Sequence, residues 1–500
     1  MFKKILIANR GEIAVRIIRA CREMGIKSAA IYSDADKTSL HTRLADEAYH
    51  IGESTASQSY LNKTKIIDLA KKIKADAIHP GYGFFSENSD FIKTLEDENI
   101  TFIGPSSKSV AMMGNKTAAR ELMSKSGVPI VPGTTKPIST IEEGIDSANK
   151  IGFPVLLKAA AGGGGKGMRK ISSVQEFKDA FEATKREAMK AFGDDSIYIE
   201  KYIENPRHIE VQVIADKHGN YAHLFERECS IQRRHQKIIE ESPSSFVDEE
   251  TRGKITQAAV NAAKACGYFN AGTIEFLMDS NKEFYFLEMN TRIQVEHPVT
   301  ELISGIDLVK EQINIALGKK LSFKQEDIKI SGHAFESRIY AEDPNNNFLP
   351  ATGKLSEYKI PGGPGIRVDD GFGTGSEISV YYDPLISKLI VWAQDRLSAI
   401  ERMKRALSEY QISGVINNIS FLDAIFSNDN FSKSKIDINF LEREYKAIMI
   451  SSKDDDELLE DAAAIISALI KEKSLVRKKE DSYYSHSKNS NNYWTSLLYE

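Results

Sequence analysis

Cysteine is scarce in this 500-residue sequence, which has only Cys21, Cys229 and Cys266, far apart along the chain. Three widely spaced cysteines predict neither disulfide bonds nor a structural zinc site, and they favour a reducing compartment. An excess of one charge is also missing, because 66 Lys and Arg stand against 71 Asp and Glu. A net charge of -5 argues against nucleic acid as the principal partner.

Long apolar runs are absent as well. The longest, at residues 462–470, is far below the roughly 18 residues that a membrane-spanning helix needs. The N-terminal lysines are followed by an apolar run at 5–8 only, which is too short for the apolar core of a signal peptide. We therefore expect a cytoplasmic protein. Its 41% apolar and 27% charged residues are typical of a folded soluble chain, and its length predicts about three domains at roughly 150 residues each.

The first hundred residues alternate short apolar runs with helical patterns. Apolar runs at 5–8, 28–32, 76–79 and 101–103 are separated by amphipathic or Gly/Pro-punctuated segments. This alternation predicts a parallel sheet flanked by helices. The first turn, at residues 9–14, offers one glycine where a dinucleotide fingerprint needs three, so NAD or FAD binding is disfavoured there. A tight turn with Arg10 in an interdomain salt bridge is the favoured interpretation.

Two further regions follow. From about residue 115, strands are expected at 154–159, 196–202 and 208–215, the last ending in a hairpin turn at 216–219. After Phe323 a third domain is expected, with a strand at 385–393 and a helix at 398–409. Beyond residue 447 the sequence predicts an amphipathic helix at 458–470 and a polar tail. The apolar residues 493–499 are interpreted as folding back on their own domain rather than docking onto a partner.

The run Gly162 to Gly167 directly follows an expected strand that carries Lys158. Consecutive glycines let backbone N–H groups approach an anion, and flanking lysines suit phosphate. A flexible linker is the alternative. A Walker A loop is excluded, because Ala160 stands where its first glycine is needed and Gly167 replaces the Ser or Thr that binds magnesium.

Alternation along residues 284–292 places Glu288, Asn290 and Arg292 on one strand face. The preceding strand, at 273–278, carries Glu275. An even-numbered hairpin loop, with Met278 paired to Glu283, would put Glu275 on the face of Glu288, and an odd-numbered loop would not. Two carboxylates and an amide oxygen suit Mg²⁺ that also holds phosphate. A merely solvated strand face is the alternative, weakened by the polar residues that continue to Pro298.

A second polar region gives a less specific signal. His208, Glu210 and Gln212 alternate on one strand, and the run 227–237 is dense in charged and amide side chains. Anion binding and an ordinary charged surface explain this run equally well.

Together these stretches resemble the biotin carboxylase component of biotin-dependent carboxylases, an ATP-grasp ligase. The matching segments are 7–14, 79–83, 162–167, 226–241 and 288–301, and the likeness covers about residues 1–446. The resemblance implies an α/β and α+β chain with a Rossmann-like N-terminal domain at 1–115 and an ATP-grasp domain at 116–330, whose mobile glycine-rich lid spans about 131–203. A C-terminal mixed α+β domain at 331–446 and the helix and polar tail at 447–500 would follow.

The resemblance also implies a role for each residue that matches its motifs. ATP would be bound by Lys116, Lys158, Gly164, Gly165, Glu200, Lys201, Tyr202, Ile203, His208, Gln232 and His235, together with Glu275 and Glu288. Mg²⁺ or Mn²⁺ would be held by Glu275 and Glu288 with Asn290 assisting. Bicarbonate would be held by Lys237, Arg292 and the Val295 backbone. Glu296 would deprotonate it, and Arg338 would face the biotin ureido group. A structural salt bridge of Arg338 near Glu336 and Glu342 is the alternative for that residue.

The implied reaction is ATP-dependent carboxylation of biotin through carboxyphosphate. Because the sequence contains no Ala/Val-Met-Lys-Met attachment motif and no room for a carboxyltransferase, biotin is expected on a separate carrier protein. Partners would be this carrier, the carboxyltransferase subunits, and another copy of the chain. The final acceptor, whether acetyl-CoA, propionyl-CoA or pyruvate, stays open. Another ATP-grasp ligase acting through an acyl phosphate is the alternative, and 232–237 with 292–296 favour biotin carboxylase. A non-catalytic assembly protein would be expected to lack Glu296 or a metal carboxylate, and all are present.

Overall fold

The computed structural model describes residues 1–134, 136–159, 168–449 and 465–468. The chain separates into two compact units, Met1–Tyr445 and Lys446–Glu500. In the second unit residues 465–468 are helical, and Ile465 and Ile466 are exposed. The rest of the helix predicted at 458–470, the apolar residues at 493–499 and the glycine run at 162–167 lie outside the described residues. Within the described ranges, no helix is both long and apolar enough to cross a membrane.

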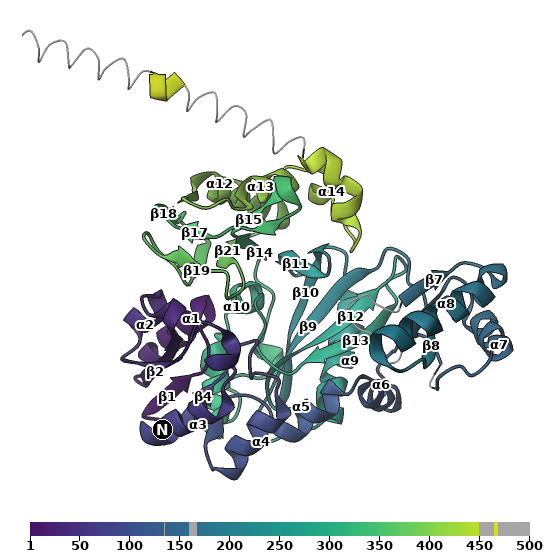
Figure 1. Cartoon of the computed structure of the whole chain (residues 1–500), viewed down its shortest axis with the longest axis horizontal. Coiled ribbons are helices and arrows are strands. Elements are labelled where there is room, and N and C mark those ends of the chain that lie inside the picture. The colour runs from purple at the N-terminus through teal and green to yellow at the C-terminus, as the bar shows by residue number, and fades with distance from the viewer. Residues whose placement is uncertain (135, 160–167, 450–464, 469–500) are drawn as a thin grey trace, which may run out of the picture. The chain divides into compact units, whose positions relative to one another are not determined.

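The N-terminal part of the first unit, purple in Figure 1, contains a parallel sheet. This sheet has five strands in the order β3-β2-β1-β4-β5. Its strands are β1 (Lys4–Ile7), β2 (Lys27–Ser33), β3 (Glu47–Gly52), β4 (Ala77–His79) and β5 (Thr101–Phe102). Its helices are α1 (Gly11–Glu23), α2 (Leu40–Leu44), α3 (Lys63–Lys72), α4 (Ser89–Asp97) and α5 (Ser107–Gly114). The predicted parallel sheet is confirmed. Arg10 pairs with Asp36 of this same region, so the expected interdomain salt bridge was wrong.

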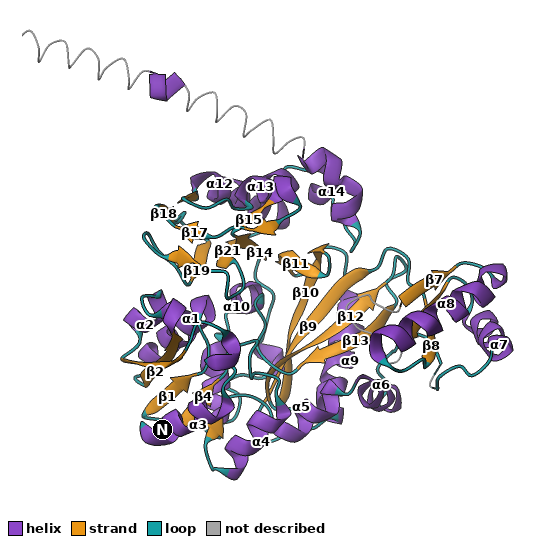
Figure 2. Ribbon diagram, in the orientation of Figure 1, coloured by secondary structure: helices purple, strands orange, loops and turns teal. Residues whose placement is uncertain are grey.

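An eight-stranded antiparallel sheet forms the centre of the unit, in the order β13-β12-β9-β10-β11-β14-β21-β19 (Figure 2). Its strands are β9 (Arg207–Ala215), β10 (Tyr221–Arg233), β11 (Gln236–Ser242), β12 (Asn270–Met278), β13 (Phe284–Asn290), β14 (His333–Tyr340), β19 (Ile366–Asp370) and β21 (Leu385–Ala393). Because β11 pairs with β14, one sheet continues across residue 330, where the sequence suggested a domain boundary.

Helices cover this sheet on both faces. They are α9 (Glu249–Ala265), α10 (His297–Ser304), α11 (Leu308–Ala316) and α12 (Arg396–Glu409). α9 packs on β9, β10 and β12, α10 on β10, β11, β14 and β21, and α12 on β14 and β21. The apolar residues of α9 and of β9, β12 and β13 form one buried cluster, while the opposite face of β9 and β12 carries the polar side chains of His208, Glu210, Gln212, Thr273 and Glu275. The polar face is where the predicted site residues meet.

A smaller sheet, ordered β7-β6-β8, lies between the two regions in sequence. It consists of β6 (Val155–Ala159), β7 (Met168–Ile171) and β8 (Ile197–Lys201), with α6 (Lys116–Lys125), α7 (Ile141–Ile151) and α8 (Val174–Phe192) nearby in sequence. Helices α7 and α8 share a buried apolar cluster with β6 and β8. The strands expected at 154–159 and 196–202 are confirmed.

The remaining elements are short. They are β15 (Glu342–Asp343), β16 (Leu349–Pro350), β17 (Gly353–Lys354), β18 (Glu357–Lys359), β20 (Glu377–Ile378), β22 (Gln411–Ser413), α13 (Ile419–Phe426) and α14 (Asp429–Ser432). The strand and helix expected at 385–393 and 398–409 are confirmed as β21 and α12.

The β12–β13 hairpin differs from the prediction. Met278 pairs with Phe284 around an odd-numbered loop, so the expected pairing with Glu283 was wrong. That register alone would set Glu275 opposite Leu287. A bulge between Phe286 and Glu288 adds one residue to β13, and Glu275 therefore pairs with Glu288. The two carboxylates share a face because of the bulge and not because of the loop.

The polar run at 227–237 is a second hairpin, formed by β10 and β11. Its turn is Arg234 and His235, which both have positive φ, 49° and 67°. Two-residue hairpin turns of this type favour Asn-Gly, because those residues adopt positive φ at little cost. With arginine and histidine in the turn, the sequence carried no hairpin signal.

Candidate active site

Lys237 joins three buried carboxylates at the end of the β10–β11 hairpin. Its Nζ lies 2.6 Å from Glu210, 3.0 Å from Glu275 and 2.7 Å from Glu296. Glu210 lies in β9, Glu275 lies in β12, and Glu296 is the N-cap residue of α10. Burial lowers the pKa of a lysine, but the three acids outweigh it and raise the pKa of Lys237 well above its ordinary value. The ammonium group is therefore charged and tied into the centre of the site.

Glu275 is the most densely bonded of these acids. It also accepts hydrogen bonds from Asn290 and Gln294, each at 2.8 Å, and lies 3.0 Å from His208 Nε2. Burial would raise the pKa of Glu275, yet Lys237 and His208 lower it well below its ordinary value. The residue is a carboxylate at neutral pH.

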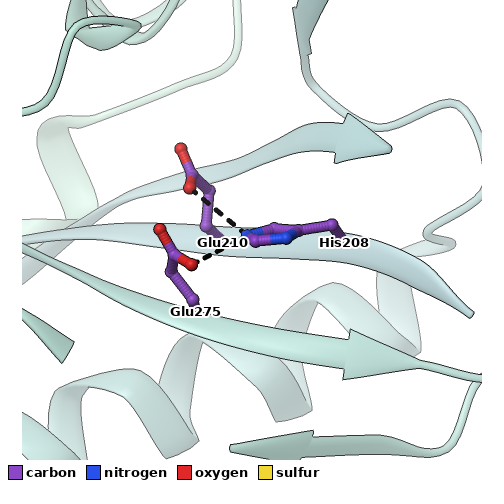
Figure 3. Close-up of side chains that lie close together, drawn as sticks. All are labelled: His208, Glu210 and Glu275. Atoms are coloured by element: carbon purple, nitrogen blue, oxygen red, sulfur yellow. Dashed lines mark ion pairs between the residues drawn. The ribbon is translucent and has the colours of Figure 1, made fainter. Parts of the chain in front are cut away.

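His208, Glu210 and Glu275 converge closely enough to offer three ligand atoms to one cation (Figure 3). The two acids come from neighbouring strands and point to the imidazole, which bonds to Gln232 through Nδ1. This grouping includes Glu275 of the predicted metal set. Glu288 lies opposite Glu275 in the sheet with an exposed side chain, and partial desolvation followed by the charge of Glu275 raises its pKa.

Arg227 lies beneath this site and is fully buried. It donates to Glu210 and Gln294 at 2.6 Å each, and also to Gln212, Thr273 and Thr300. These bonds reach several elements, so a single guanidinium fixes β9, β12 and the start of α10 relative to one another. Gln294, held in this way, donates in turn to Glu275.

Glu296 lies between two cations. Its oxygens are 2.7 Å from Lys237 and 3.1 Å from Arg338. Burial would raise the pKa of Glu296, but the charges of Lys237, Arg338 and Arg227 lower it well below its ordinary value. Arg338 also pairs with Glu240, at 2.5 Å, and not with Glu336 or Glu342 as the alternative interpretation suggested.

Arg292 is fixed by contacts on both sides of its guanidinium. Nε lies 2.8 Å from Glu87, and the side chain donates to Asn290 Oδ1 at 2.8 Å. Asn290 therefore turns its oxygen to Arg292 and its Nδ2 to Glu275. The neighbouring carbonyl of Val295 accepts a hydrogen bond from the buried Lys388 at 2.8 Å.

The residues predicted to bind the nucleotide are spread over the smaller sheet and its surroundings. Lys158 and Arg120 both pair with Glu200, at 2.7 and 2.8 Å, and Lys201 donates to the carbonyl of Gly152 at 2.8 Å. Tyr202 and Ile203 follow β8 and are half-buried, whereas Lys116 at the start of α6 and His235 in the hairpin turn are exposed. Gly164 and Gly165 lie outside the described residues.

Several residues of the site were not predicted from the sequence. No role was expected for Glu87, Glu240 and Lys388, whereas Glu210 and Arg227 were only members of stretches of polar side chains. These residues can be recognised only in the folded structure, because their contacts join segments that are far apart in the sequence. Glu87 contacts Arg292, 205 positions away, and Lys388 contacts Val295, 93 positions away. Charged residues in otherwise apolar strands, such as Lys388 within β21, were the available hint.

Comparisons with known proteins agree with this geometry. A family model for the biotin carboxylase N-terminal domain matches residues 1–110, the carbamoyl-phosphate synthase L chain ATP-binding domain matches 115–324, and the biotin carboxylase C-terminal domain matches 336–443. Fold and site together define an ATP-grasp ligase.

Two similar proteins specify which kind of ATP-grasp ligase the chain is. A pyruvate carboxylase subunit of Methanothermobacter thermautotrophicus is 55% identical over 89% of this chain and 90% of its own length, and biotin carboxylase 2 of Bacillus subtilis is 53% identical over 89% and 100%. The chain belongs to the biotin carboxylase family and is an ATP-dependent ligase. The resemblance and the fold class predicted from the sequence are confirmed.

Solved structures give the same result. The biotin carboxylase domain dimer of Hydrogenobacter thermophilus 2-oxoglutarate carboxylase, in complex with MgADP, ADP and bicarbonate, is 50% identical with a TM-score of 0.82. It is matched over 90% of this chain and 99% of that one. Biotin carboxylase of Campylobacter jejuni, in a β,γ-ATP complex, is 48% identical with a TM-score of 0.83, over 89% and 99%.

Proposed function

We propose that this protein carboxylates biotin on a separate biotin carboxyl carrier protein, using ATP and bicarbonate through carboxyphosphate. The observation that carries the proposal is the convergence of Glu210, Glu275 and Glu296 on Lys237. This convergence brings a candidate metal ligand, a cation for an anionic substrate and a candidate base within reach of one ammonium group. A reaction between bicarbonate and a metal-bound phosphate requires such proximity.

Glu275 and Glu288 are the proposed ligands of Mg²⁺ or Mn²⁺. Two carboxylates directly opposite each other on a sheet repel, and the raised pKa of Glu288 reflects partial desolvation of its side chain and that repulsion. An oxygen-binding divalent cation between them fits this donor set and would neutralise charge on the transferred phosphoryl group. Asn290 can assist only after its amide turns, because its oxygen now accepts from Arg292.

ATP is proposed to lie between the smaller sheet and the polar face of β9 and β12. Lys116 and Lys158 would meet its phosphates, Gly164 and Gly165 would cover them, and residues 200–203 would hold the adenine. His208, Gln232 and His235 would complete the site. Lys158 is bonded to Glu200 at 2.7 Å, so phosphate has to compete with that carboxylate.

Lys237, Arg292 and the Val295 backbone are proposed to hold bicarbonate, and Glu296 to deprotonate it. The lowered pKa keeps Glu296 ionised at neutral pH, as a base requires. Bicarbonate would draw Lys237 away from Glu296, because the cation then shares its charge with the substrate. The carboxylate gains basicity at the moment the proton has to move.

Arg338 is the proposed partner of the biotin ureido oxygen. Carboxyphosphate would decompose to CO₂ and phosphate, and phosphate would take the N1 proton of biotin. The developing negative charge on the ureido oxygen would be stabilised by the guanidinium of Arg338. Its pairs with Glu240 and Glu296 hold the guanidinium near the proposed base.

The partners and domain limits are proposals as well. A carrier protein as partner is supported by the relatives that the chain matches, a pyruvate carboxylase subunit and a biotin carboxylase. Carboxyltransferase partners, a homodimer and a cytoplasmic location complete the proposal. The domains proposed are 1–115, 116–330 with a lid at about 131–203, 331–446 and 447–500, and the family-model matches support their order.

The test is ADP release by purified protein with ATP, Mg²⁺ and bicarbonate, with and without free biotin. Biotin should stimulate release, and Arg338→Ala should remove the stimulation while ATP still binds. A rate that biotin leaves unchanged, or parallel loss of ATP binding in the variant, would contradict the proposal.

A further inference from the structure

Two acidic residues lie directly opposite each other in the middle of the large sheet. Glu240 of β11 pairs with Glu336 of β14, and both side chains are fully buried. Arg338 lies two residues along β14 on the same face, and Lys388 of β21 lies opposite Arg338. α10 packs on this face, so the pair has no access to bulk water through it.

The hydrogen bonds of this pair are incomplete. Arg338 donates from Nε to Glu240 Oε1 at 2.7 Å. Glu240 Oε2 and both carboxyl oxygens of Glu336 have no hydrogen-bond partner among the described residues. Buried polar atoms without partners are costly, and two facing carboxylates would add repulsion. A single proton between the two acids removes the repulsion and satisfies an oxygen on each.

The surroundings place that proton on Glu336. The groups that face it are Glu240 from β11, Arg338 from its own strand, Lys388 from β21 and Glu296 at the start of α10. Burial raises the pKa of Glu240 to about 7, although its contact with Arg338 favours the anionic form. Lys388 bonds instead to the Val295 carbonyl at 2.8 Å and to Glu12 at 3.2 Å. Burial raises the pKa of Glu336 well above its ordinary value, and Glu240 and Glu296 add to the rise against Lys388 and Arg338.

We propose that Glu336 is a neutral carboxylic acid whose hydroxyl donates to Glu240, and that this pair positions Arg338 for biotin. The proposal rests on the role proposed above for Arg338. Glu240 and Glu296 compete for one guanidinium, at 2.5 and 3.1 Å. A Glu240 carboxylate fixed by Glu336 keeps the shorter of the two contacts with Arg338, which weakens the hold of that guanidinium on Glu296 and leaves Glu296 available as the base. Glu240 and Glu336 are thus positioning residues.

The experiment compares Glu240→Gln, Glu336→Gln and Arg338→Ala in the full-length protein. Glu228→Gln is the matched control, because Glu228 is a buried acid paired with Arg207 at 3.0 Å and has no proposed role in the reaction. Three quantities are measured: kcat/KM for free biotin, bicarbonate-dependent ATP hydrolysis without biotin, and the infrared carbonyl band of protonated carboxyl groups at neutral pH.

We expect Glu240→Gln to lower kcat/KM for biotin by about 10- to 100-fold, as loss of one charge-assisted hydrogen bond predicts, while hydrolysis without biotin changes less than about threefold. Glu336→Gln keeps a donor toward Glu240, so it should retain biotin activity within about threefold, but its spectrum should lose intensity in the carbonyl band.

The inference is overturned if Glu336→Gln leaves the infrared spectrum unchanged, or if Glu240→Gln keeps full activity with biotin. It is also overturned if Glu240→Gln and Glu228→Gln lose the same activities in the same proportion, which would indicate a structural role. If Arg338→Ala keeps biotin activity, the proposed role of Arg338 fails instead, and the infrared result still decides the protonation of Glu336.

Discussion

Glu275 lies directly opposite Glu288 in the β12–β13 hairpin because a bulge offsets an odd-numbered loop. Without the extra residue in β13, Glu275 would face Leu287, whose side chain is exposed in the observed strand. The bulge thus exchanges an apolar neighbour for a second carboxylate. Local repulsion is the cost of this arrangement, and a cation between the two acids would relieve it.

Glu288→Lys should abolish ATP-dependent phosphoryl transfer, because it removes a proposed metal ligand and reverses its charge. The fold should not suffer, since the new cation would face Glu275 and replace repulsion with attraction. We expect the free energy of unfolding without Mg²⁺ to rise by up to about 1 kcal/mol. ADP release and urea unfolding measure the two effects.

Glu283→Lys, in the exposed loop of the same hairpin, is the control and should leave activity unchanged. Near-normal activity of Glu288→Lys would refute the metal role, and a large loss of stability would refute the account of the opposed carboxylates.

The β12–β13 hairpin also shows which structural features could be predicted from the sequence and which could not. Alternation of apolar and polar residues predicted both strands, and Glu288 and Asn290 were correctly expected to share a face, because side-chain period follows from backbone geometry. Arg292 lies beyond the end of β13, which ends at Asn290. The bulge could not be predicted, because it depends on which residues of β12 and β13 reach the core together. Phe276, Phe286 and Met289 are all buried there, and the strand has to gain a residue to bury them.

Contacts between segments far apart in the sequence could not be predicted from the alternation of apolar and polar residues within a strand. The pairing of β11 with β14 joins residues almost a hundred positions apart, and no local pattern specifies its register. Consequently the salt bridge considered as the alternative for Arg338 involved its neighbours Glu336 and Glu342, whereas Glu240 reaches it from the adjacent strand.

Lys237→Met should destabilise the protein strongly, because Glu210, Glu275 and Glu296 lose a shared buried cation. Removing one member of a buried ion cluster costs about 3–5 kcal/mol. The pKa values of Glu275 and Glu296 are lowered in the folded state, so their contribution is present above the ordinary value of 4.5 and is lost as pH falls below it.

The difference in free energy of unfolding between wild type and Lys237→Met should therefore be largest at neutral pH and should decrease only at acidic pH. Urea unfolding across this range measures it. Lys254→Met, which removes an exposed lysine paired with Glu250, should match the wild type at every pH. A difference that does not narrow in acid would contradict the electrostatic explanation.

Glu87→Gln should weaken bicarbonate binding. Glu87 accepts from Arg292 Nε at 2.8 Å and from the backbone N–H of Thr291 at 2.9 Å, so it fixes the turn that follows β13. Without the charge, Arg292 is held less firmly where bicarbonate would bind. We expect KM for bicarbonate to rise about tenfold, the value of one charge-assisted hydrogen bond, while KM for ATP stays unchanged.

Steady-state kinetics with each substrate varied in turn measure this separation. Glu98→Gln, at an exposed acid paired with Lys71, serves as the control and should alter neither constant. Equal increases in both constants would indicate a general structural defect rather than a local one.

Asp36→Asn tests the electrostatics of the N-terminal sheet. Burial would raise the pKa of Asp36, but the bidentate pair with Arg10, followed by His41 and Tyr60, lowers it from 3.8 to about 2. A lowered folded-state pKa contributes stability above the ordinary value and loses it as pH falls toward the folded value. A shift of this size corresponds to on the order of 2 kcal/mol at neutral pH.

We therefore expect Asp36→Asn to lower the free energy of unfolding at neutral pH and to approach the wild type as the pH falls from about 4 toward about 2. Urea titrations at several pH values measure the convergence. Asp34→Asn is the matched control, because that carboxylate is largely exposed beside His50 and carries no comparable burial. If Asp36→Asn lowered the free energy of unfolding by the same amount at every pH, packing and not the charge pair with Arg10 would account for the lost stability.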